Sequence, residues 1–331
     1  MKRLRDMGVL IGRFGSSMRD TKEQSLSRRL KAVALGILFL PLSVSAEFID
    51  EFVVAGSGGL DDPRLFLFDG GSLFVANGAG GAVARYSATT GAFVNNFASI
   101  NQPRGVTLSP DGNSLYVSGG GTTDAVRQYN VATGALIGTT TAPSLNPFGL
   151  TFGSDGNLYV ADVGSDEILR FDATGAFIDT FVTAGLGGLD APRELVFGSD
   201  GNLYVSSADS DAVLRYNGAT GAFIDAFATG VDARGLVFGP DNNLYVASFA
   251  SNTVRRYDGT TGAFIDDFVT AGSGNLMGPV GVAFGPDGNF YVSSFLGDNV
   301  LRYTGVPEPA TTALLALGLL GVRYVRRKRV Y

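Results

Sequence analysis

Four arginines occupy equivalent places in the chain, each as the second residue of a short apolar segment. They are Arg64, Arg104, Arg193 and Arg234. Acidic residues stand two or three places before three of them, at Asp62, Asp190 and Asp232. A guanidinium forms two parallel hydrogen bonds with a carboxylate, so this set could hold an anion or a sugar. We expect the simpler alternative, in which each arginine pairs with an acidic neighbour and fixes its own loop.

A second group of acidic residues could supply oxygen ligands to a metal ion. It comprises Asp162, Asp166, Asp209, Asp211 and Asp298. Oxygen ligands alone would suit Ca²⁺ or Mg²⁺, and the sequence predicts no cofactor other than this candidate Ca²⁺. The aspartates of the short "DGN" and "DNN" turns differ, because Asp before Gly or Asn is ordinary hairpin chemistry. We therefore interpret Asp111, Asp155, Asp200, Asp241 and Asp287 as structural.

Two missing residue types exclude much of enzyme chemistry. The 331-residue chain contains no His, which is the commonest general base and metal ligand. It contains no Cys, so a thiolate nucleophile and a disulfide framework are excluded. The glycine runs at 78–81 and 119–121 complete neither a dinucleotide-binding nor a P-loop pattern. We therefore predict no catalytic residues.

The negative charge is concentrated in the middle of the chain. Residues 47–305 contain 11 arginines, no lysine and 27 acidic residues, which gives a net charge of −16. A field of this sign repels phosphate backbones, so nucleic acid is excluded as a partner.

The arginines and aspartates belong to a unit that occurs six times. Each copy contains a "LYV"-like segment, whose aromatic residue is Phe74, Tyr116, Tyr159, Tyr204, Tyr245 or Tyr291. These residues are 41 to 46 positions apart, and a period of this length indicates a repeat architecture. Each copy also holds four strand-like pieces separated by turn residues, which in the third copy are 148–152, 157–162, 167–172 and 175–182. Four antiparallel strands per copy predict the blade of a β-propeller.

The sixth copy ends after "NVLRY" (299–303), without its last strand. The segment "EFIDEFV" (47–53) matches "AFIDDFV" (263–269), the last strand of the fifth copy, at five of seven positions. We therefore predict an all-β, six-bladed propeller over 47–305, with four-stranded antiparallel blades. The strand 47–53 completes the last blade and closes the ring, which removes its free edges.

The two rims of such a ring differ in sequence. The turns between the first and second strands, and between the third and fourth, share one rim and barely vary between copies. The loops of the opposite rim vary in length, as a comparison of 182–193 with 229–234 illustrates. Variable loops on a repeated scaffold are typical of a binding site, and the four arginines should ring the channel mouth there.

A further basic position recurs in the third strand of each copy. It is Arg85, Gln128, Arg170, Arg215, Arg256 or Arg302. Because the residue recurs so regularly, we expect it to pair one blade with the next and not to take part in catalysis.

The two ends of the chain have the character of targeting segments. Arg28, Arg29 and Lys31 precede a short apolar run and small residues at Val44 and Ala46, as in an export signal. We predict a signal peptide over 1–46, with Met18 as an alternative start. At the other end, an apolar stretch from Ala310 to Val322 is followed by basic residues. This end is typical of a short transmembrane helix with its basic side in the cytoplasm.

Residues 306–331 resemble a PEP-CTERM sorting signal, in three parts that occur in order. The sorting motif consists of Val306, Pro307, Glu308 and Pro309, followed by the apolar helix and by Arg326, Arg327 and Arg329. The resemblance implies recognition by an exosortase, with a transient stage in the inner membrane of a Gram-negative bacterium. The repeats resemble NHL-type propellers, and more distantly the streptogramin-lyase and gluconolactonase-like propellers.

These resemblances lead to two hypotheses. We expect an exported, non-enzymatic binding or scaffold protein at the cell surface or in the extracellular polysaccharide matrix, with glycans or envelope proteins as partners. The alternative is a metal-dependent lactonase or lyase-like enzyme. Streptogramin-lyase-like members rely on His, which this chain lacks. Gluconolactonase-like members hold a metal with Glu, Asn and Asp, and "DDPR" (61–64) does not match their motif, so no ligands are transferred.

Overall fold

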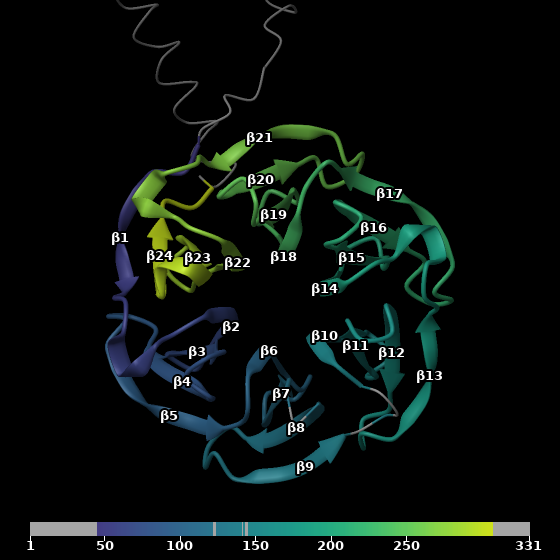
Figure 1. Cartoon of the computed structure of the whole chain (residues 1–331), viewed down its shortest axis with the longest axis horizontal. Coiled ribbons are helices and arrows are strands. Elements are labelled where there is room, and N and C mark those ends of the chain that lie inside the picture. Colours follow the sequence, from purple (N-terminus) through teal and green to yellow (C-terminus); the bar gives the residue numbers. More distant parts are fainter. Residues whose placement is uncertain (1–44, 122–123, 141, 143–144, 307–331) are drawn as a thin grey trace, which may run out of the picture. The chain divides into compact units, whose positions relative to one another are not determined.

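The computed structural model describes residues 45–121, 124–140, 142 and 145–306. These residues form six four-stranded antiparallel sheets arranged as blades around a central channel (Figure 1). The all-β six-bladed propeller predicted from the repeats is confirmed. Nearly all of the predicted signal peptide, and all of the tail after Val306, lie outside the described residues. Within the described ranges, no helix is long and apolar enough to cross a membrane.

The first three blades follow one another directly along the chain. Blade 1 consists, from the inner strand to the outer strand, of β2 (Pro63–Asp69), β3 (Ser72–Asn77), β4 (Ala82–Ser87) and β5 (Phe93–Ser99). Blade 2 consists of β6 (Pro103–Leu108), β7 (Ser114–Gly119), β8 (Ala125–Asn130) and β9 (Leu136–Thr140). Blade 3 consists of β10 (Pro147–Phe152), β11 (Leu158–Asp162), β12 (Glu167–Phe171) and β13 (Phe177–Val182).

The other three blades have the same order, and the last one takes its outer strand from the N-terminal side. Blade 4 consists of β14 (Pro192–Phe197), β15 (Leu203–Ser207), β16 (Ala212–Tyr216) and β17 (Phe223–Thr229). Blade 5 consists of β18 (Ala233–Phe238), β19 (Leu244–Ser248), β20 (Thr253–Tyr257) and β21 (Phe264–Val269). Blade 6 consists of β22 (Pro279–Phe284), β23 (Phe290–Ser294), β24 (Asn299–Tyr303) and β1 (Phe48–Val53).

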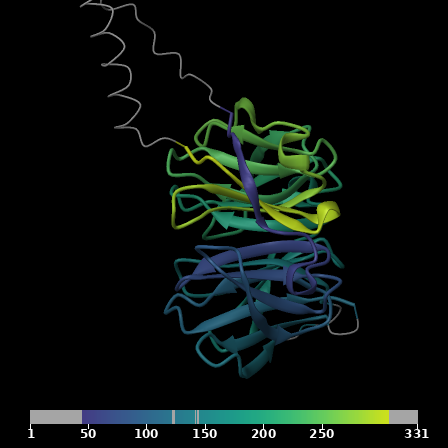
Figure 2. The same cartoon turned by 90° about the vertical axis from the view of Figure 1, so that its left-hand side faces the viewer.

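The ring closes as the sequence predicts. Strand β1 pairs antiparallel with β24, and Phe48 lies opposite Tyr303. In the side view, the purple β1 lies against the yellow β24 (Figure 2). Ala46, where the predicted signal peptide ends, is buried, and its N–H donates to the carbonyl of Phe268 (2.7 Å). Processing after Ala46 would remove this contact and leave β1 intact.

The core lies between the blades, because each sheet is apolar on both faces. The second strand of every blade carries the repeated aromatic residue, whose side chain is at most 5% exposed. Tyr204, for example, packs edge-on against Phe227 of its own blade and Phe238 of the next, with ring centroids 4.9 and 5.0 Å apart. Such edge-to-face pairs contribute beyond the area that they bury.

The turn aspartates shape the hairpins, as predicted. The Asp287 carboxylate accepts hydrogen bonds from the N–H of Asn289 (3.1 Å), the Asn289 side chain (2.7 Å) and the hydroxyl of Tyr291 (2.9 Å). Gly288 between them has φ +77°, which glycine adopts without strain. Asp155, Asp200 and Asp241 make the same three contacts, so this rim is held by internal bonds.

Three long loops that enter blades 1, 4 and 6 fasten neighbouring blades together. Each contains a short 3₁₀ turn, namely η1 (Ser57–Gly59), η2 (Leu186–Gly188) or η3 (Ser273–Asn275). The hydroxyl of Tyr86 donates to the carbonyl of Ser57 (2.8 Å), and the Phe93 ring fills the space where a Gly58 side chain would stand. The glycines in these loops thus allow close packing on an outer strand. A fourth 3₁₀ turn, η4 (Phe295–Gly297), lies between β23 and β24.

Candidate binding site at the channel mouth

The inner strand of each blade delivers one side chain to the channel mouth. Five of the six strands begin with proline followed by this residue. Proline lacks a backbone N–H, and the first position of a strand tolerates that lack. Serines of the second strands fix the backbone there. Ser293 donates to the carbonyl of Arg64 (2.7 Å) and Ser206 to the carbonyl of Arg234 (2.8 Å). The mouth is therefore positioned by hydrogen bonds between blades.

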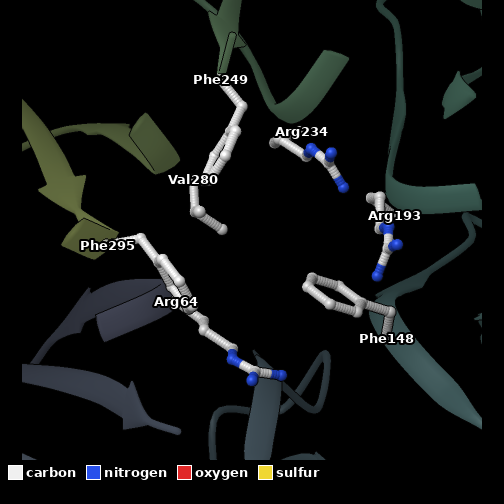
Figure 3. A pocket seen from close by; sticks show the side chains of 7 residues that line it. All are labelled: Arg64, Phe148, Arg193, Arg234, Phe249, Val280 and Phe295. Atoms are coloured by element: carbon white, nitrogen blue, oxygen red, sulfur yellow. The ribbon is translucent and has the colours of Figure 1, made fainter. Parts of the chain in front are cut away.

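Seven side chains line a pocket of about 170 Å³ at this mouth (Figure 3). They are Arg64, Phe148, Arg193, Arg234, Phe249, Val280 and Phe295. Arg64, Phe148, Arg193, Arg234 and Val280 come from the inner strands. Phe249 follows β19 and Phe295 begins η4. The pocket is cationic on one side and aromatic on the other.

Phe148 is the centre of the cationic side. The guanidinium carbons of Arg193, Arg104 and Arg64 lie 5.0, 5.8 and 5.9 Å from the centroid of its ring. Arg234 lies over the Phe249 ring at 5.1 Å. Aromatic faces attract cations, but three guanidinium groups around one ring also repel one another. An anion between them would relieve this repulsion.

The pKa shifts of the mouth arginines have the same cause. Burial, followed by the charge of Arg104, lowers the pKa of Arg64 to about 10. Burial and the charge of Arg234 lower the pKa of Arg193, and burial lowers that of Arg104. Within the described residues, the Nε groups of Arg64, Arg104 and Arg193 are buried without a hydrogen-bond acceptor. These Nε groups are therefore shielded from water and keep an unused donor.

The expected pairing with acidic neighbours occurs at one arginine only. Arg234 Nε lies 2.9 Å from Asp232 Oδ1. Arg104 instead donates to the side chain of Asn146 and to the carbonyl of Pro147 (3.2 Å). Among the described contacts, neither Arg64 nor Arg193 forms an ion pair.

Asp62 and Asp190 lie in the loops beside the mouth. Burial and the charge of Asp61 raise the pKa of Asp62. The N–H of Asp190 donates to Ser207 Oγ (2.9 Å). The structure thus brings Arg64, Arg193 and Arg234 into one pocket, with Arg104 and Asp232 against it. The loop geometry leaves Asp62 and Asp190 unpaired with any of these arginines in the described part of the chain.

The predicted metal ligands do not converge on one point. Asp162 is buried, and its carboxylate accepts hydrogen bonds from the N–H groups of Asn146 and Gly164 and from the hydroxyl of Ser165. Asp166 accepts from the N–H of Ala191 (2.8 Å) and Asp298 from the N–H of Asp62 (3.0 Å), so each fastens a loop to the next blade. Asp209 and Asp211 are exposed.

The one acidic cluster in the described ranges with suitable spacing combines Asp61, Asp62 and Asp298. Their carboxylate oxygens lie within 4.8 Å of one another. Three monodentate oxygens could begin a Ca²⁺ site, which needs six to eight.

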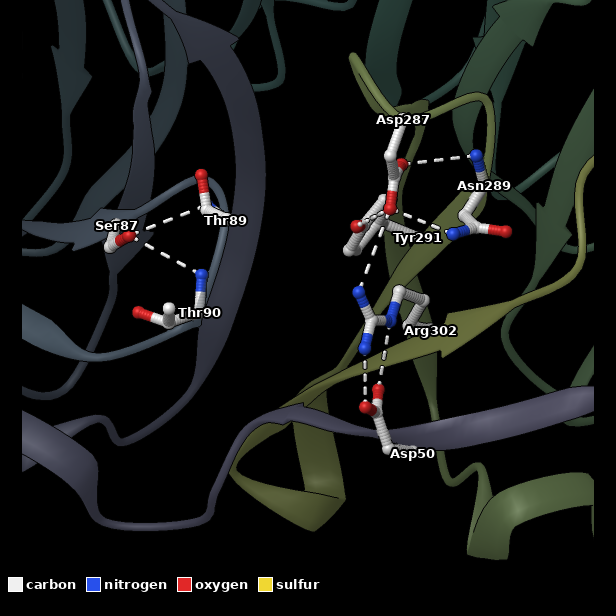
Figure 4. Close-up of polar contacts among 8 residues, drawn as sticks. All are labelled: Asp50, Ser87, Thr89, Thr90, Asp287, Asn289, Tyr291 and Arg302. Atoms are coloured by element: carbon white, nitrogen blue, oxygen red, sulfur yellow. Dashed lines mark hydrogen bonds and ion pairs between the residues drawn. The ribbon is translucent and has the colours of Figure 1, made fainter.

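Four of the recurring arginines of the third strands pair within their own blade, and the prediction of pairing between blades is wrong for them; Arg85 lies opposite Asn95 instead. Arg302 Nε and Nη2 donate to the two oxygens of Asp50 at 3.0 and 2.5 Å (Figure 4). Arg170, Arg215 and Arg256 bind Asp179, Asp225 and Asp266 in the same bidentate way. The cause is the antiparallel register, which places each arginine opposite the aspartate of the adjacent outer strand.

Glu194 is a half-buried acid that the sequence analysis did not single out. It lines the central channel below the mouth, in a cavity of about 280 Å³ bounded by the six inner strands. Its carboxylate accepts a hydrogen bond from the N–H of Leu195 (3.2 Å). Burial raises the pKa of Glu194 to about 8. Four of the other five blades carry glycine at this position, for example Gly149, whose added Cβ would lie 2.4 Å from the Arg193 carbonyl.

Sequence reasoning also missed Phe249, Phe295 and the serines behind the mouth. The serines had a visible signal, because "YVSG" or "YVSS" occurs in the second strand of copies 2, 4 and 6. The two phenylalanines lie in variable loops, and only the closed ring brings them to one pocket.

Comparisons with known proteins agree with the propeller and with the tail. Residues 69–209 match the model of the SMP-30/Gluconolactonase/LRE-like region, and residues 305–329 match the PEP-CTERM protein-sorting motif. The motif indicates export and sorting to the envelope or surface of a Gram-negative bacterium, and exosortase recognises it. No curated protein sequence matches the chain.

Solved propeller structures share the fold at low sequence identity. Virginiamycin B lyase from Staphylococcus aureus is 13% identical, with a TM-score of 0.57 over 77% of this chain and 98% of that one. An inactive His-to-Ala variant of that lyase with quinupristin is 14% identical, with a TM-score of 0.56 over 78% and 87%. Hydrazine synthase from Kuenenia stuttgartiensis is 17% identical, with a TM-score of 0.57 over 75% and 97%.

Proposed function

Because the chain is an SMP-30/gluconolactonase-like and NHL-like β-propeller with a PEP-CTERM sorting motif, we propose that it is an exported protein that binds acidic glycans at its channel mouth. It holds the glycan and does not cleave it. The tail delivers the propeller through the inner membrane to the cell surface or the extracellular matrix.

One observation carries the proposal: Arg64, Arg104 and Arg193 surround the Phe148 ring, and no acidic side chain of the described residues pairs with them. Their planar donors match a carboxylate through two hydrogen bonds. The rings of Phe148, Phe249 and Phe295 offer apolar faces to the C–H groups of a sugar. A uronic acid combines both features, and the pocket volume suits one sugar unit at the end of a chain.

The absence of histidine supports a role without turnover. The inactive lyase variant lacks one histidine, and this chain contains none. The second candidate function, a Ca²⁺- or Mg²⁺-dependent lactonase or lyase, is favoured by the cluster of Asp61, Asp62 and Asp298 on the same rim.

Titration calorimetry with galacturonic-acid oligomers tests the proposal, and glucose oligomers of equal length are the control. We expect binding of the acidic oligomer only, with at least a tenfold loss of affinity in Arg64→Ala and in Arg193→Ala. Arg215→Ala removes an arginine from an outer ion pair and should bind normally. Equal binding of both oligomers would contradict the proposal.

Mass spectrometry of the recovered oligomer and a lactone panel with Ca²⁺ and Mg²⁺ distinguish the two functions. Unchanged oligomer and unchanged lactones are expected. Metal-dependent turnover that is lost in Asp298→Asn would replace binding by catalysis as the function.

A further inference from the structure

The outer strands expose a band of apolar side chains around the whole ring. Eleven of the fifteen exposed large hydrophobic residues are the first two residues of an outer strand, such as Ile137 at 53% and Ile178 at 43% exposure. Because this pair recurs in every blade, it does not by itself distinguish the outer edge of one blade from that of another. The remaining residues of the outer strands do differ between blades.

Four outer strands carry features that prevent pairing with another chain. Strands β1, β13, β17 and β21 each contain an aspartate that is bound by an arginine of the adjacent strand. Each of them also has two register shifts along its pairing with that strand. Charges and bulges are the usual devices that keep a free edge from joining another sheet.

Strand β9 of blade 2 lacks the paired aspartate and one of the two register shifts. Its sequence, "LIGTT", has no charge, and Gly138 stands opposite Gln128 where blades 3 to 6 have aspartate opposite arginine. Its pairing with β8 contains one register shift instead of two. A glycine inside a strand often marks the close approach of another backbone. Strand β5, its neighbour on the ring (Figure 1), is also uncharged but keeps both shifts.

The distribution of charge favours a second copy of this chain as the partner. Residues 63–140, which form blades 1 and 2, contain four arginines and three aspartates. The rest of 47–305 contains seven arginines and 24 acidic residues. Two copies that meet through any other sector would bring strongly acidic surfaces together. Contact through blade 2 keeps these surfaces apart.

We propose that two copies form a symmetric dimer by antiparallel pairing of β9 with β9 across Gly138. The free N–H and C=O groups of both edges are then satisfied, and the two blades form one continuous eight-stranded sheet. Leu136 and Ile137 of each copy, exposed by 55% and 53%, lie over the joint. The short strand makes the dimer weak and concentration-dependent.

Sedimentation velocity over a concentration series tests the dimer. Ile137→Lys should raise the dimer dissociation constant at least tenfold, whereas Ile178→Lys, at the matched position of blade 3, should change it less than twofold. Higher salt should strengthen the wild-type dimer, because it screens the repulsion between the two acidic bodies.

A second variant guards against loss of folding. Gln128→Arg with Gly138→Asp installs in blade 2 the ion pair found in blades 3 to 6. An added Cβ at Gly138 meets only the Gln128 side chain, at 3.6 Å, so the change fits the fold. This variant should melt no lower than wild type and remain monomeric. A wild type that is monomeric at every concentration would overturn the proposal, as would a dimer that Ile178→Lys disrupts and Ile137→Lys does not.

Discussion

The arginines of the channel mouth (the inner set) and those of the third strands (the outer set) have the same side chain in two different electrostatic settings. In the outer set, Arg170, Arg215 and Arg302 donate two hydrogen bonds to one aspartate each, and these bonds raise the pKa of the guanidinium groups. In the inner set, burial lowers the pKa of Arg64 and Arg193. The difference supports the proposed division of roles: a paired charge stabilises its blade, whereas a half-buried arginine without an ion pair keeps its donors for the proposed ligand.

Removal of the most buried outer arginine should have the largest effect on stability. The side chain of Arg256 is only 9% exposed and bonds to Asp266 at 2.5 and 3.1 Å. Arg256→Ala leaves the carboxylate of Asp266, which is only 17% exposed, without its partner, so the free energy of unfolding should fall by about 3 kcal/mol. Urea denaturation measures this loss.

Arg170→Ala is the matched control for Arg256→Ala. Arg170 is 21% exposed and its partner Asp179 is 44% exposed, so the loss should be about 1 kcal/mol or less. Equal losses in the two variants would show that burial does not set the strength of these pairs.

The second effect concerns Glu194, which directly follows Arg193; neither residue forms an ion pair within the described part of the chain. Its pKa is about 8 in the folded protein, whereas an unfolded glutamate has a pKa of about 4.3. Between these values the folded state keeps a proton that the unfolded state has released. The stability from this group is therefore complete below pH 4.3 and is lost as the pH rises to 8.

Glu194→Gln should remove this pH dependence. Relative to wild type, the variant should gain about 1.4 kcal/mol of unfolding free energy for each pH unit between pH 4.3 and pH 8, and nothing at pH 4. Thermal melts across this range measure the difference. A constant difference at all pH values would mean that the Glu194 carboxyl is hydrated in the channel.

The smallest effect should have the opposite sign to that of the outer arginines. Arg193→Ala removes a buried charge that two other guanidinium groups repel, so unfolding free energy should rise by about 0.5 kcal/mol or stay unchanged. Differential scanning calorimetry at low salt is suited to so small a change. A loss as large as that of Arg256→Ala would place Arg193 among the structural residues.

The repeat pattern predicts most of the fold, because every copy carries its own strand and turn signals. The match of 47–53 to 263–269 was enough to predict ring closure by β1. The mouth arginines were also visible, since each follows the start of an inner strand. The aromatic rings that these arginines contact were not visible in the sequence. Phe148 attracts three arginines only because separate blades converge there, and this convergence depends on the diameter of the ring.

Pairing of the outer arginines failed as a prediction for a related reason. Arg215 and Asp225 are ten residues apart, and the register of β16 with β17 decides whether they face each other. Glu194 looked like one of 27 acidic residues until its inner-strand position placed it in the channel.

Binding of a galacturonic-acid oligomer to wild type, Arg193→Ala and Arg215→Ala decides whether the channel mouth is the binding site. We expect Arg193→Ala to lose at least tenfold in affinity with its melting temperature intact. We expect Arg215→Ala to keep its affinity and to melt at a lower temperature. Equal affinities in all three proteins would contradict the assignment of the channel mouth as the binding site.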